Sequence, residues 1–257
     1  MDDTFRGRRA LVTGASSGIG AELARGLAER GADLVLVARR RERLEEVAQT
    51  CRLFGAKVEI ATADLADPAA RDALAATHGA VDVLVNNAGL GVFGPFAEAD
   101  WARTARMLEV NVTALAHLSR LYAPAMAGRG FGRILLVGST AAFQPVPLYA
   151  AYAASKSFVV AFGVALDEEL RAQGVRVTTL CPGVTESEFH DVAGQRKSQF
   201  VRRSMMTSAE VARIGLAGLA KGRPVVVAGG MNAAMALGAR LAPPSLTARL
   251  AHRMMKP

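Results

Sequence analysis

Residues 8–20, R-R-A-L-V-T-G-A-S-S-G-I-G, join a short apolar run to three glycines. The run over residues 8–13 predicts a buried strand, and a helical pattern follows the glycines to a stop at Gly31. A strand, a glycine turn and a helix N-terminus form a pyrophosphate site, because glycines let the backbone approach the ligand and free N–H groups favour its charge. A helix entry with flexible glycines is the alternative, which the position directly after the first strand disfavours.

Strands and helices alternate along the rest of the chain. We expect further strands ending near Ala38, at Asp64-Leu65 and at Asn86, followed by the runs G-R-I-L-L-V, V-R-V-T-T-L-C and R-P-V-V-V-A. The alternation predicts an α/β fold with one parallel sheet of about seven strands, covered by helices on both faces in three layers. We expect a single domain over residues 1–257.

The helices carry their own signals. Pro68 is expected to begin one, and Thr207 with Glu210 has the spacing of a capping box. A long helical pattern from about residue 100 to 127 contains Asn111, which is either surface decoration or a distortion that holds a water, because Asn competes for backbone groups. The sequence after residue 228 predicts an Ala/Met/Leu-rich helical tail with Pro243-Pro244 inside it.

The end of the second strand bears on the choice of nucleotide. In folds of this kind that strand end meets the adenosine ribose, and an acidic residue there binds the hydroxyls of NAD. This chain has Ala38 followed by Arg39. A guanidinium suits a ribose 2′-phosphate by charge and bidentate geometry, so the sequence favours NADP(H) over NAD.

Residues 152–156, Y-A-A-S-K, place Tyr152 and Lys156 on one helix face, one turn apart. An ammonium near a phenol favours the phenolate and lowers its pKa, which suits a proton donor. Ser139 ends the fifth predicted strand upstream, so the three side chains together could bind a carbonyl oxygen and protonate it. A Tyr and a Lys at this spacing are more often a half-buried ring and a solvated amine without a catalytic role. The other motifs of the chain are what favour the catalytic interpretation.

Composition excludes several classes. The chain has 257 residues of which 51% are apolar, which excludes a disordered protein. We expect no secretory signal and no membrane span, and Cys51 and Cys181 are expected to be reduced thiols without metal-type spacing. The net charge of +8 suggests nucleic acid, but the arginines are scattered and aromatic residues are few, so we expect no nucleic-acid partner.

Taken together, the motifs resemble those of the short-chain dehydrogenase/reductase family, in its branch of about 250 residues with a Rossmann-like doubly wound sheet. The matching motifs occur in the family's order: T-G-A-S-S-G-I-G at 13–20, N-N-A-G at 86–89, Asn111, Ser139, Y-A-A-S-K at 152–156 and C-P-G at 181–183.

The resemblance implies a role for each matched position. Tyr152 would be the acid/base, Ser139 would polarise the substrate carbonyl, and Lys156 would tune the tyrosine and bind the nicotinamide ribose. Asn111 would support a water for proton relay. The implied cofactor-binding set is Gly14, Ser16, Ser17, Gly18, Ile19, Gly20, Arg39, Asp64, Leu65, Asn87, Ala88, Gly89, Tyr152, Lys156, Pro182, Gly183, Val184 and Ser187. Ser187 stands where the family often has a threonine.

The implied activity is an NADP(H)-dependent oxidoreductase that interconverts a carbonyl compound and an alcohol. A catalytically idle NADP-binding sensor or interaction protein is the alternative. The net charge and the apolar tail leave a third hypothesis, a basic binder of nucleic acid or a membrane surface. Substrate contacts are expected from Ser139, Phe143, Tyr149 and Tyr152, with a moderately hydrophobic substrate and a mobile lid at about 184–206. We further expect a cytoplasmic homodimer or homotetramer, since two long Ala-rich helices offer apolar surface for subunit pairing.

Overall fold

The computed structural model describes residues 3–186, 189 and 205–255. Its centre is a seven-stranded sheet in the order β3-β2-β1-β4-β5-β6-β7, in which every neighbouring pair is parallel. The strands are β1 (Arg9–Thr13), β2 (Asp33–Ala38), β3 (Val58–Thr62), β4 (Val83–Asn86), β5 (Gly132–Val137), β6 (Val175–Cys181) and β7 (Val225–Val227). The predicted doubly wound α/β fold is therefore confirmed.

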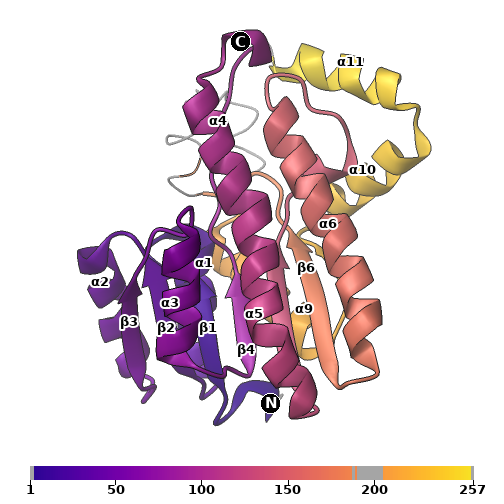
Figure 1. Cartoon of the computed structure of the whole chain (residues 1–257). Coiled ribbons are helices and arrows are strands. Elements are labelled where there is room, and N and C mark those ends of the chain that lie inside the picture. The colour runs from indigo at the N-terminus through magenta and orange to yellow at the C-terminus, as the bar shows by residue number, and fades with distance from the viewer. Residues whose placement is uncertain (1–2, 187–188, 190–204, 256–257) are drawn as a thin grey trace.

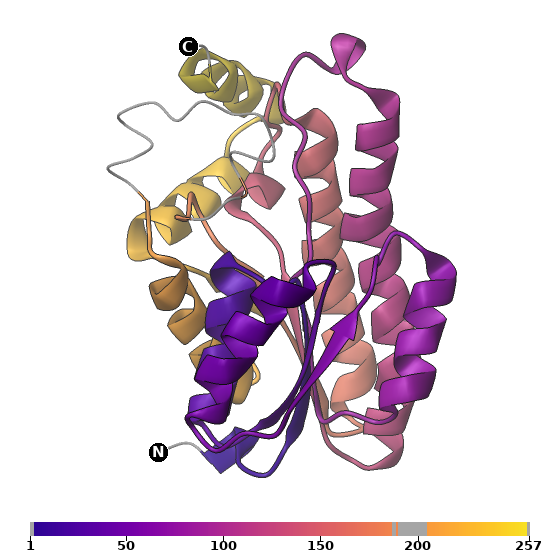
Figure 2. The same cartoon turned by 90° about the vertical axis from the view of Figure 1, so that its left-hand side faces the viewer.

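Helices cover both faces of this sheet, as Figures 1 and 2 show. One face packs against α1 (Gly18–Glu29), α2 (Arg41–Arg52) and α9 (Ser208–Ala220). The opposite face packs against α3 (Pro68–His78), α5 (Leu115–Gly128) and α6 (Ala150–Arg171). The remaining helices are α4 (Trp101–Leu108), α10 (Gly230–Leu241), α11 (Pro244–Met255), the 3-10 turns η1 (Asp3–Phe5), η2 (Phe96–Glu98) and η4 (Thr140–Phe143), and the π segment η3 (Glu109–Ala114).

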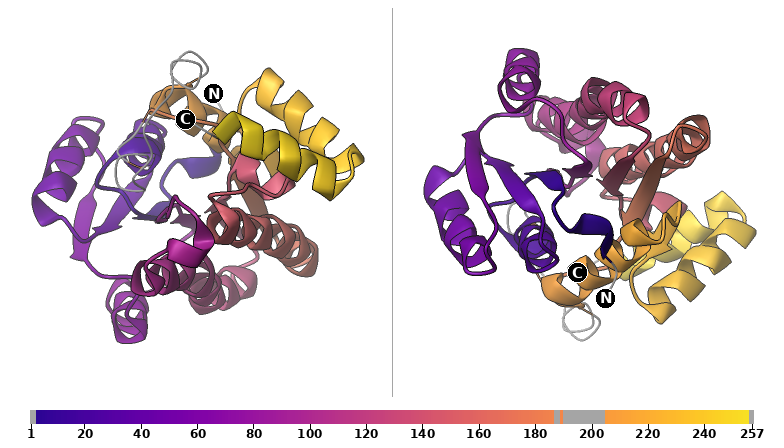
Figure 3. Two further views of the ribbon diagram at one scale, coloured as in Figure 1. Left: turned by 90° about the horizontal axis from the view of Figure 1, so that it is seen from above. Right: turned by 90° about the horizontal axis from the view of Figure 1, so that it is seen from below.

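The central strands are apolar on both sides because both faces of the sheet are covered. All four residues of β4 are buried, and in β5 and β6 only the second residue of each is not. The outermost strands differ: β3 and β7 have no fully buried residue. The buried centre fixes the carboxyl ends of β1, β4, β5 and β6 beside one another, which Figure 3 shows from above.

Side-chain caps set several helix starts. The Asp67 side chain accepts a hydrogen bond from Ala69 N–H, and Pro68 begins α3 as predicted. Thr207 and Glu210 form the predicted capping box at α9, with each side chain bonded to the other's backbone N–H.

The helical pattern over residues 100–127 is not one regular helix. It begins after the Asp100 cap as α4, widens into the π segment η3, and continues as α5. Asn111 lies inside the π segment and is completely buried. Of the two readings of this Asn, the structure favours the distortion, since π segments are common where a side chain is redirected for function.

One predicted boundary was wrong. β3 ends at Thr62, short of Asp64-Leu65, because the Asp64 side chain accepts from Ala66 N–H and its carbonyl from Asp67 N–H, which makes a turn. The C-terminal tail is helical as predicted, and it divides into two helices because Ala242 is extended ahead of Pro243-Pro244.

α6 is the one helix among the described residues that is long and apolar enough to cross a membrane, with 44% of its apolar window buried. Val159 belongs to the core cluster between α6 and the sheet. Its apolar character is therefore explained by packing onto the sheet.

Candidate active site

A cavity of about 810 Å³ lies at the carboxyl ends of β1, β4, β5 and β6. It extends from the glycine turn after β1, past the residues that follow β4 and β5, to the inner side of α10 and α11. In open parallel sheets ligands bind at this edge, where the strand order reverses between β1 and β4. The fold therefore puts the glycine turn and the Ser139, Tyr152 and Lys156 motifs beside one cavity.

The glycine turn is shaped by steric necessity at two positions. Gly14 has φ +64°, and a Cβ on it would lie 2.8 Å from Asn87 Nδ2. A Cβ on Gly20 would collide with the Gly14 carbonyl oxygen and with Asn87 Nδ2. Only glycine therefore lets α1 begin this close to the residues that follow β4.

Thr13 and Asn87 lock this turn to the next strand. The Thr13 hydroxyl donates to the Val85 carbonyl and accepts from the N–H groups of Asn87 and Ala88. Asn87 Nδ2 in turn donates to the carbonyls of Thr13 at 3.0 Å and Gly14 at 3.2 Å. The predicted polar turn thus holds the backbone of the glycine loop in place.

The first turn of α1 faces the cavity through Ser16, Ser17, Gly18 and Ile19. The Ser17 side chain does not cap the N–H groups of that turn, so Ser17 leaves them available to an anion. The close-packed glycines and this uncapped helix start fit the pyrophosphate of a dinucleotide.

Two arginines lie at the far end of the cavity. Arg39, which the sequence singles out, lines it, and so does Arg40, the N-cap of α2. Arg40 Nη2 lies 3.2 Å from Ser17 Oγ and 3.4 Å from Ser16 Oγ. The sequence analysis missed Arg40; the run Arg39-Arg40-Arg41 was the available signal, but the extended backbone of Arg40 that turns it to the glycine loop was not predictable.

Asp64 lines the same end of the cavity. Its Oδ2 lies 2.6 Å from Arg106 Nη2 on α4. Partial burial would raise the pKa of this carboxyl, but the hydrogen bonds from Arg106 and Ala66 and the nearby Arg39 charge outweigh it, and the pKa is lowered. Asp64 is therefore an anion that accepts hydrogen bonds, as an adenine contact requires. Arg106 is a second cavity residue that the sequence analysis did not select.

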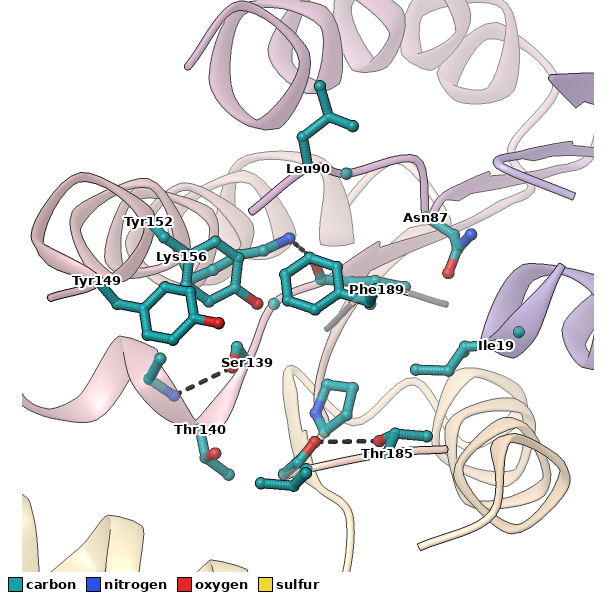
Figure 4. A pocket seen from close by; sticks show the side chains of 18 of the residues that line it. Ile19, Asn87, Leu90, Ser139, Thr140, Tyr149, Tyr152, Lys156, Thr185 and Phe189 are labelled. Carbon is teal, nitrogen blue, oxygen red and sulfur yellow. Dashed lines mark hydrogen bonds between the residues drawn. The ribbon is translucent and has the colours of Figure 1, made fainter. Parts of the chain in front are cut away.

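Ser139, Tyr152 and Lys156 converge on the middle of the cavity, as Figure 4 shows. Ser139 follows β5 and caps η4, its Oγ accepting from Ala141 N–H at 3.1 Å. Tyr152 and Lys156 come from the first turns of α6, and the Lys156 side chain is buried with its Nζ donating to the Val137 carbonyl at 2.8 Å.

The environment moves the two titratable groups in opposite directions. Burial raises the pKa of Tyr152 to about 12, while hydrogen bonding with Ser139 acts to lower it. Burial lowers the pKa of Lys156 to about 8. Desolvation is the larger effect at both groups because each would have to be charged away from water. The lowering of the tyrosine pKa by the lysine stays a prediction.

Asn111 supports this centre from the π segment. Its Oδ1 accepts from Leu90 N–H at 2.8 Å, and its Nδ2 donates to the Leu90 carbonyl at 2.9 Å and to Ser155 Oγ at 3.1 Å. A Cβ on Gly89 would lie 3.3 Å from Asn111 Oδ1 and 3.4 Å from Lys156 Nζ. Asn111 therefore ties the segment after β4 to α6, one side chain away from Lys156.

Aromatic side chains form the wall beside Tyr152. Its ring centre lies 5.5 Å from that of Tyr149 and 5.3 Å from that of Phe189, and Phe93 is 5.0 Å from Tyr149. Phe143 also lines the cavity and lies under the Arg240 guanidinium at 5.0 Å. Tyr149 and Phe143 thus stand where substrate contacts are predicted.

The inner side of α10 and α11 was not predicted as part of the site. Nine cavity-lining residues come from these helices and the segment between them: Asn232, Met235, Ala236, Gly238, Ala239, Ala242, Thr247, Leu250 and Ala251. The tail's apolar character was visible in the sequence, but nothing local indicates that it folds back over the sheet's edge.

Other predicted cofactor contacts can be placed. Leu65, Ala88, Gly89, Pro182, Gly183 and Val184 all line the cavity. Ser187 lies outside the described residues, as does most of the predicted lid at 184–206. The two ends of that segment are joined, since Glu186 N–H donates to the Met206 carbonyl and Met206 N–H to the Val184 carbonyl. Thr185 offers a hydroxyl to this part of the cavity.

Within the described part of the chain, no group of three His, Cys, Asp or Glu side chains could hold a metal ion. Cys51 and Cys181 are free and buried.

A family model for short chain dehydrogenase matches residues 8–198, which include the glycine turn and the Ser139, Tyr152 and Lys156 centre. The chain belongs to the short-chain dehydrogenase/reductase family. This oxidoreductase family therefore accounts for the fold and for the order of the motifs.

Three individual proteins illustrate the likeness. Ketoacyl reductase HetN of Nostoc sp. is 34% identical over 70% of this chain, and the match spans 64% of HetN, less than two thirds of its length. A short-chain dehydrogenase from Sphingobium yanoikuyae, solved in complex with NADPH, is 33% identical with a TM-score of 0.82, covering 91% of this chain and 94% of that one. A family member from Burkholderia phymatum in complex with NAD is 28% identical with a TM-score of 0.82, covering 91% and 93%.

Proposed function

We propose that this protein is an NADP(H)-dependent oxidoreductase that interconverts a carbonyl compound and an alcohol. The observation that carries the proposal is the convergence of Ser139, Tyr152 and Lys156 on one cavity whose other end presents Arg39 and Arg40. A nicotinamide cofactor, when bound, supplies the hydride. The chain's own residues then have to orient the carbonyl and move one proton.

Ser139 and Tyr152 would share the carbonyl oxygen. Their side chains face the same hollow, and the Ser139 hydroxyl is fixed by its hydrogen bond from Ala141 N–H. A raised pKa keeps Tyr152 protonated at neutral pH, so its hydroxyl is available to donate to the oxygen as charge develops there.

Lys156 would steady the proton transfer and hold the ribose. Its buried Nζ keeps one donor on the Val137 carbonyl and has two more for the cavity. Burial lowers the pKa of Lys156 to about 8. Lys156 can therefore exchange protons with nearby hydroxyl groups at near-neutral pH. Asn111 positions the neighbouring Leu90 backbone and Ser155, and so indirectly the lysine.

The preference for NADP(H) rests on charge. Arg39 and Arg40 put two guanidinium groups at the cavity end nearest the second strand, and no acidic residue follows β2 directly. A 2′-phosphate gains charge-assisted hydrogen bonds there, whereas free ribose hydroxyls lack an acceptor. The NADPH complex of the Sphingobium relative supports this assignment. The Burkholderia relative binds NAD on a similar fold, so the fold alone does not decide between the two nucleotides.

The cavity wall favours a moderately hydrophobic substrate. Phe189, Tyr149 and Val146 line it near Tyr152, and Met235 and Leu250 line it farther out. The direct test is to follow NADPH and NADH oxidation with a panel of aliphatic and aromatic ketones and aldehydes of increasing size. NADPH-dependent turnover of at least one apolar carbonyl supports the proposal; cofactor binding without turnover of any member would favour the idle sensor.

We further propose a cytoplasmic homo-oligomer formed by one domain over residues 1–257. Phe158 and Val164 are exposed on the outer side of α6, and Phe158 stacks on Phe162 at 5.5 Å. Exposed apolar side chains on a long helix suit pairing with a second copy. Light scattering should show a mass that is a multiple of 26.9 kDa, and Phe158→Glu should lower that mass. A monomer of the unmodified protein at micromolar concentration would contradict the assignment.

A further inference from the structure

We propose that the outer face of α10 and α11 is a docking surface for an anionic lipid bilayer. The surface is made of large apolar side chains that the fold leaves exposed: Met231, Met235, Leu237, Leu241, Leu246 and Leu250. We call it the C-terminal apolar surface. Leu241, at the end of α10, is 81% exposed. Exposed apolar side chains that lie together like this mark a site of contact with another protein or with a membrane.

The charged residues of the C-terminal helices are all basic. Residues 211–257 contain seven Lys and Arg residues and no Asp or Glu. Within the described part of α10 and α11 the Lys and Arg residues are Arg240, Arg249 and Arg253, and all three are exposed. Apolar side chains beside unopposed arginines are the combination that attaches helices to the headgroup region of anionic membranes.

The charge also argues against a second copy of the chain as the occupant. A two-fold contact centred on this face would bring it against itself, and would therefore bring Arg249 and Arg253 close to the same arginines of the other subunit. No acidic residue on α10 or α11 offsets that repulsion. An anionic lipid surface, by contrast, complements both properties of the face.

Two more exposed aromatic residues lie at the same end of the molecule. Phe96 on η2 and Trp101 at the start of α4 are 59% and 66% exposed. Figures 1 and 2 both show η2 and α11 at this end, above the carboxyl ends of the strands. Trp is favoured at membrane interfaces. Glu98 and Asp100 flank these two residues, so the attraction to anionic lipid comes from the α10–α11 side.

The surface is also the outer side of the cavity wall. Met235 and Leu250, which belong to this surface, also line the cavity and are about half exposed to solvent. A bilayer resting on the C-terminal apolar surface would therefore lie next to the cavity. This geometry stands independently of the proposed chemistry, because it depends on the exposed face and not on Tyr152.

The test is co-sedimentation of the full chain with vesicles of phosphatidylcholine alone and of phosphatidylcholine with phosphatidylglycerol. We expect at least about tenfold tighter binding to the anionic vesicles, decreasing with added salt. Leu241→Glu/Leu246→Glu should weaken that binding by at least about tenfold, because it replaces two apolar side chains that would enter the bilayer with carboxylates that the anionic lipid repels. Neither residue lines the cavity, so NADPH binding, followed by fluorescence, should be unchanged.

Leu53→Glu is the matched control. Leu53 is 85% exposed at the end of α2, away from α10 and α11, so the same substitution there should leave vesicle binding unchanged. Should the double variant fail to fold, Arg249→Glu/Arg253→Glu tests the electrostatic half of the surface and should also abolish the preference for anionic vesicles.

Three outcomes would overturn the proposal. The first is no vesicle binding by the unmodified chain. The second is equal loss of binding in Leu53→Glu and in the double variant. The third is a double variant that changes the mass in light scattering and leaves vesicle binding intact, since the face would then be a contact between copies. Loss of turnover with retained vesicle binding would instead affect only the proposed enzymatic function.

Discussion

Lys156 Nζ lies 5.8 Å from the centre of the Tyr152 ring, and it is held there by a 2.8 Å hydrogen bond to the Val137 carbonyl. The side chain is only 5% exposed. An ammonium is thus kept inside the protein, next to the phenol, by a backbone acceptor and not by a carboxylate. This arrangement has a consequence for stability as well as for catalysis.

We predict that Lys156→Met raises the free energy of unfolding at pH 7 while abolishing turnover. The pKa of Lys156 falls from 10.5 to about 8 on folding, so below pH 8 the folded state holds a proton that it binds more weakly than the unfolded chain does. Keeping Lys156 charged in the folded state costs about 3 kcal/mol of stability. This is an upper bound on the gain from Lys156→Met, because the variant also loses the hydrogen bond to the Val137 carbonyl.

The pH dependence checks the sign. As pH rises from about 8 to 10.5, the folded state loses its proton before the unfolded state does, so the cost diminishes and disappears above that range. Urea unfolding of both proteins should show the largest advantage of Lys156→Met at pH 7 and a smaller one near pH 10. An advantage that stays constant with pH would contradict the assignment of a buried ammonium.

We predict that Tyr152→Phe folds and binds NADPH but loses turnover by roughly 10²–10⁴-fold, the range for removal of a general acid. The ring contacts with Tyr149 and Phe189 do not need the hydroxyl, so packing should be preserved. Steady-state kinetics with the best ketone of the panel, together with cofactor titration, measures both parts. Tyr149→Phe should cost far less in kcat, and an equal loss in the two variants would mean that the proton donor has been misassigned.

We predict that Arg40→Ala weakens NADPH binding by about 1–3 kcal/mol and leaves NADH binding nearly unchanged, as expected for one charge-assisted hydrogen bond to a phosphate. The same should hold for Arg39→Ala. Arg40 is the more informative of the two because its Nη2 already lies 3.2 Å from Ser17 Oγ in the glycine turn.

Arg41→Ala is the control for this pair. Arg41 follows Arg40 in the sequence but lies 3.5 Å from Glu45 on α2 and does not line the cavity. Fluorescence titration with both nucleotides should therefore separate the three arginines. Equal affinity of the unmodified protein for NADPH and NADH would exclude the proposed role of Arg39 and Arg40.

The parts of the fold that could be predicted are those with a local cause. Pro68, the Thr207–Glu210 capping box and the strand-length apolar runs each set an element, and the confirmed parallel sheet follows from their alternation. The predicted end of β3 was wrong because the Asp64 side chain accepts a hydrogen bond from Ala66 N–H and starts a turn there. Apolar patterning does not reveal this competition between a side chain and strand pairing.

The parts of the site that escaped prediction are set by tertiary packing. Arg106 reaches Asp64 across 42 positions of sequence, and α10 and α11 return to the cavity after β7. Neither relationship has a spacing rule. By contrast, Tyr152 and Lys156 share one helix, and Gly14 and Gly20 share one turn, so their proximity is local and was predictable.

The last prediction concerns the glycine turn and uses a matched pair of substitutions. Gly20→Ala should lower the free energy of unfolding and abolish nucleotide binding, because the new Cβ would collide with the Gly14 carbonyl and with Asn87 Nδ2. Relief of that contact would push α1 away from the residues after β4 and break the hydrogen bonds by which Asn87 holds the turn. Overpacking of this kind costs about 1–3 kcal/mol or more.

Gly128→Ala supplies the comparison at the end of α5, where a Cβ would meet nothing within 4 Å. It should be neutral or stabilising by up to about 1 kcal/mol, since alanine in a helix restricts the unfolded chain more than glycine does. Thermal unfolding with and without NADPH measures both effects. If Gly20→Ala kept the nucleotide-induced rise in Tm, the close approach of α1 to the Gly14 carbonyl would not be what forms the pyrophosphate site.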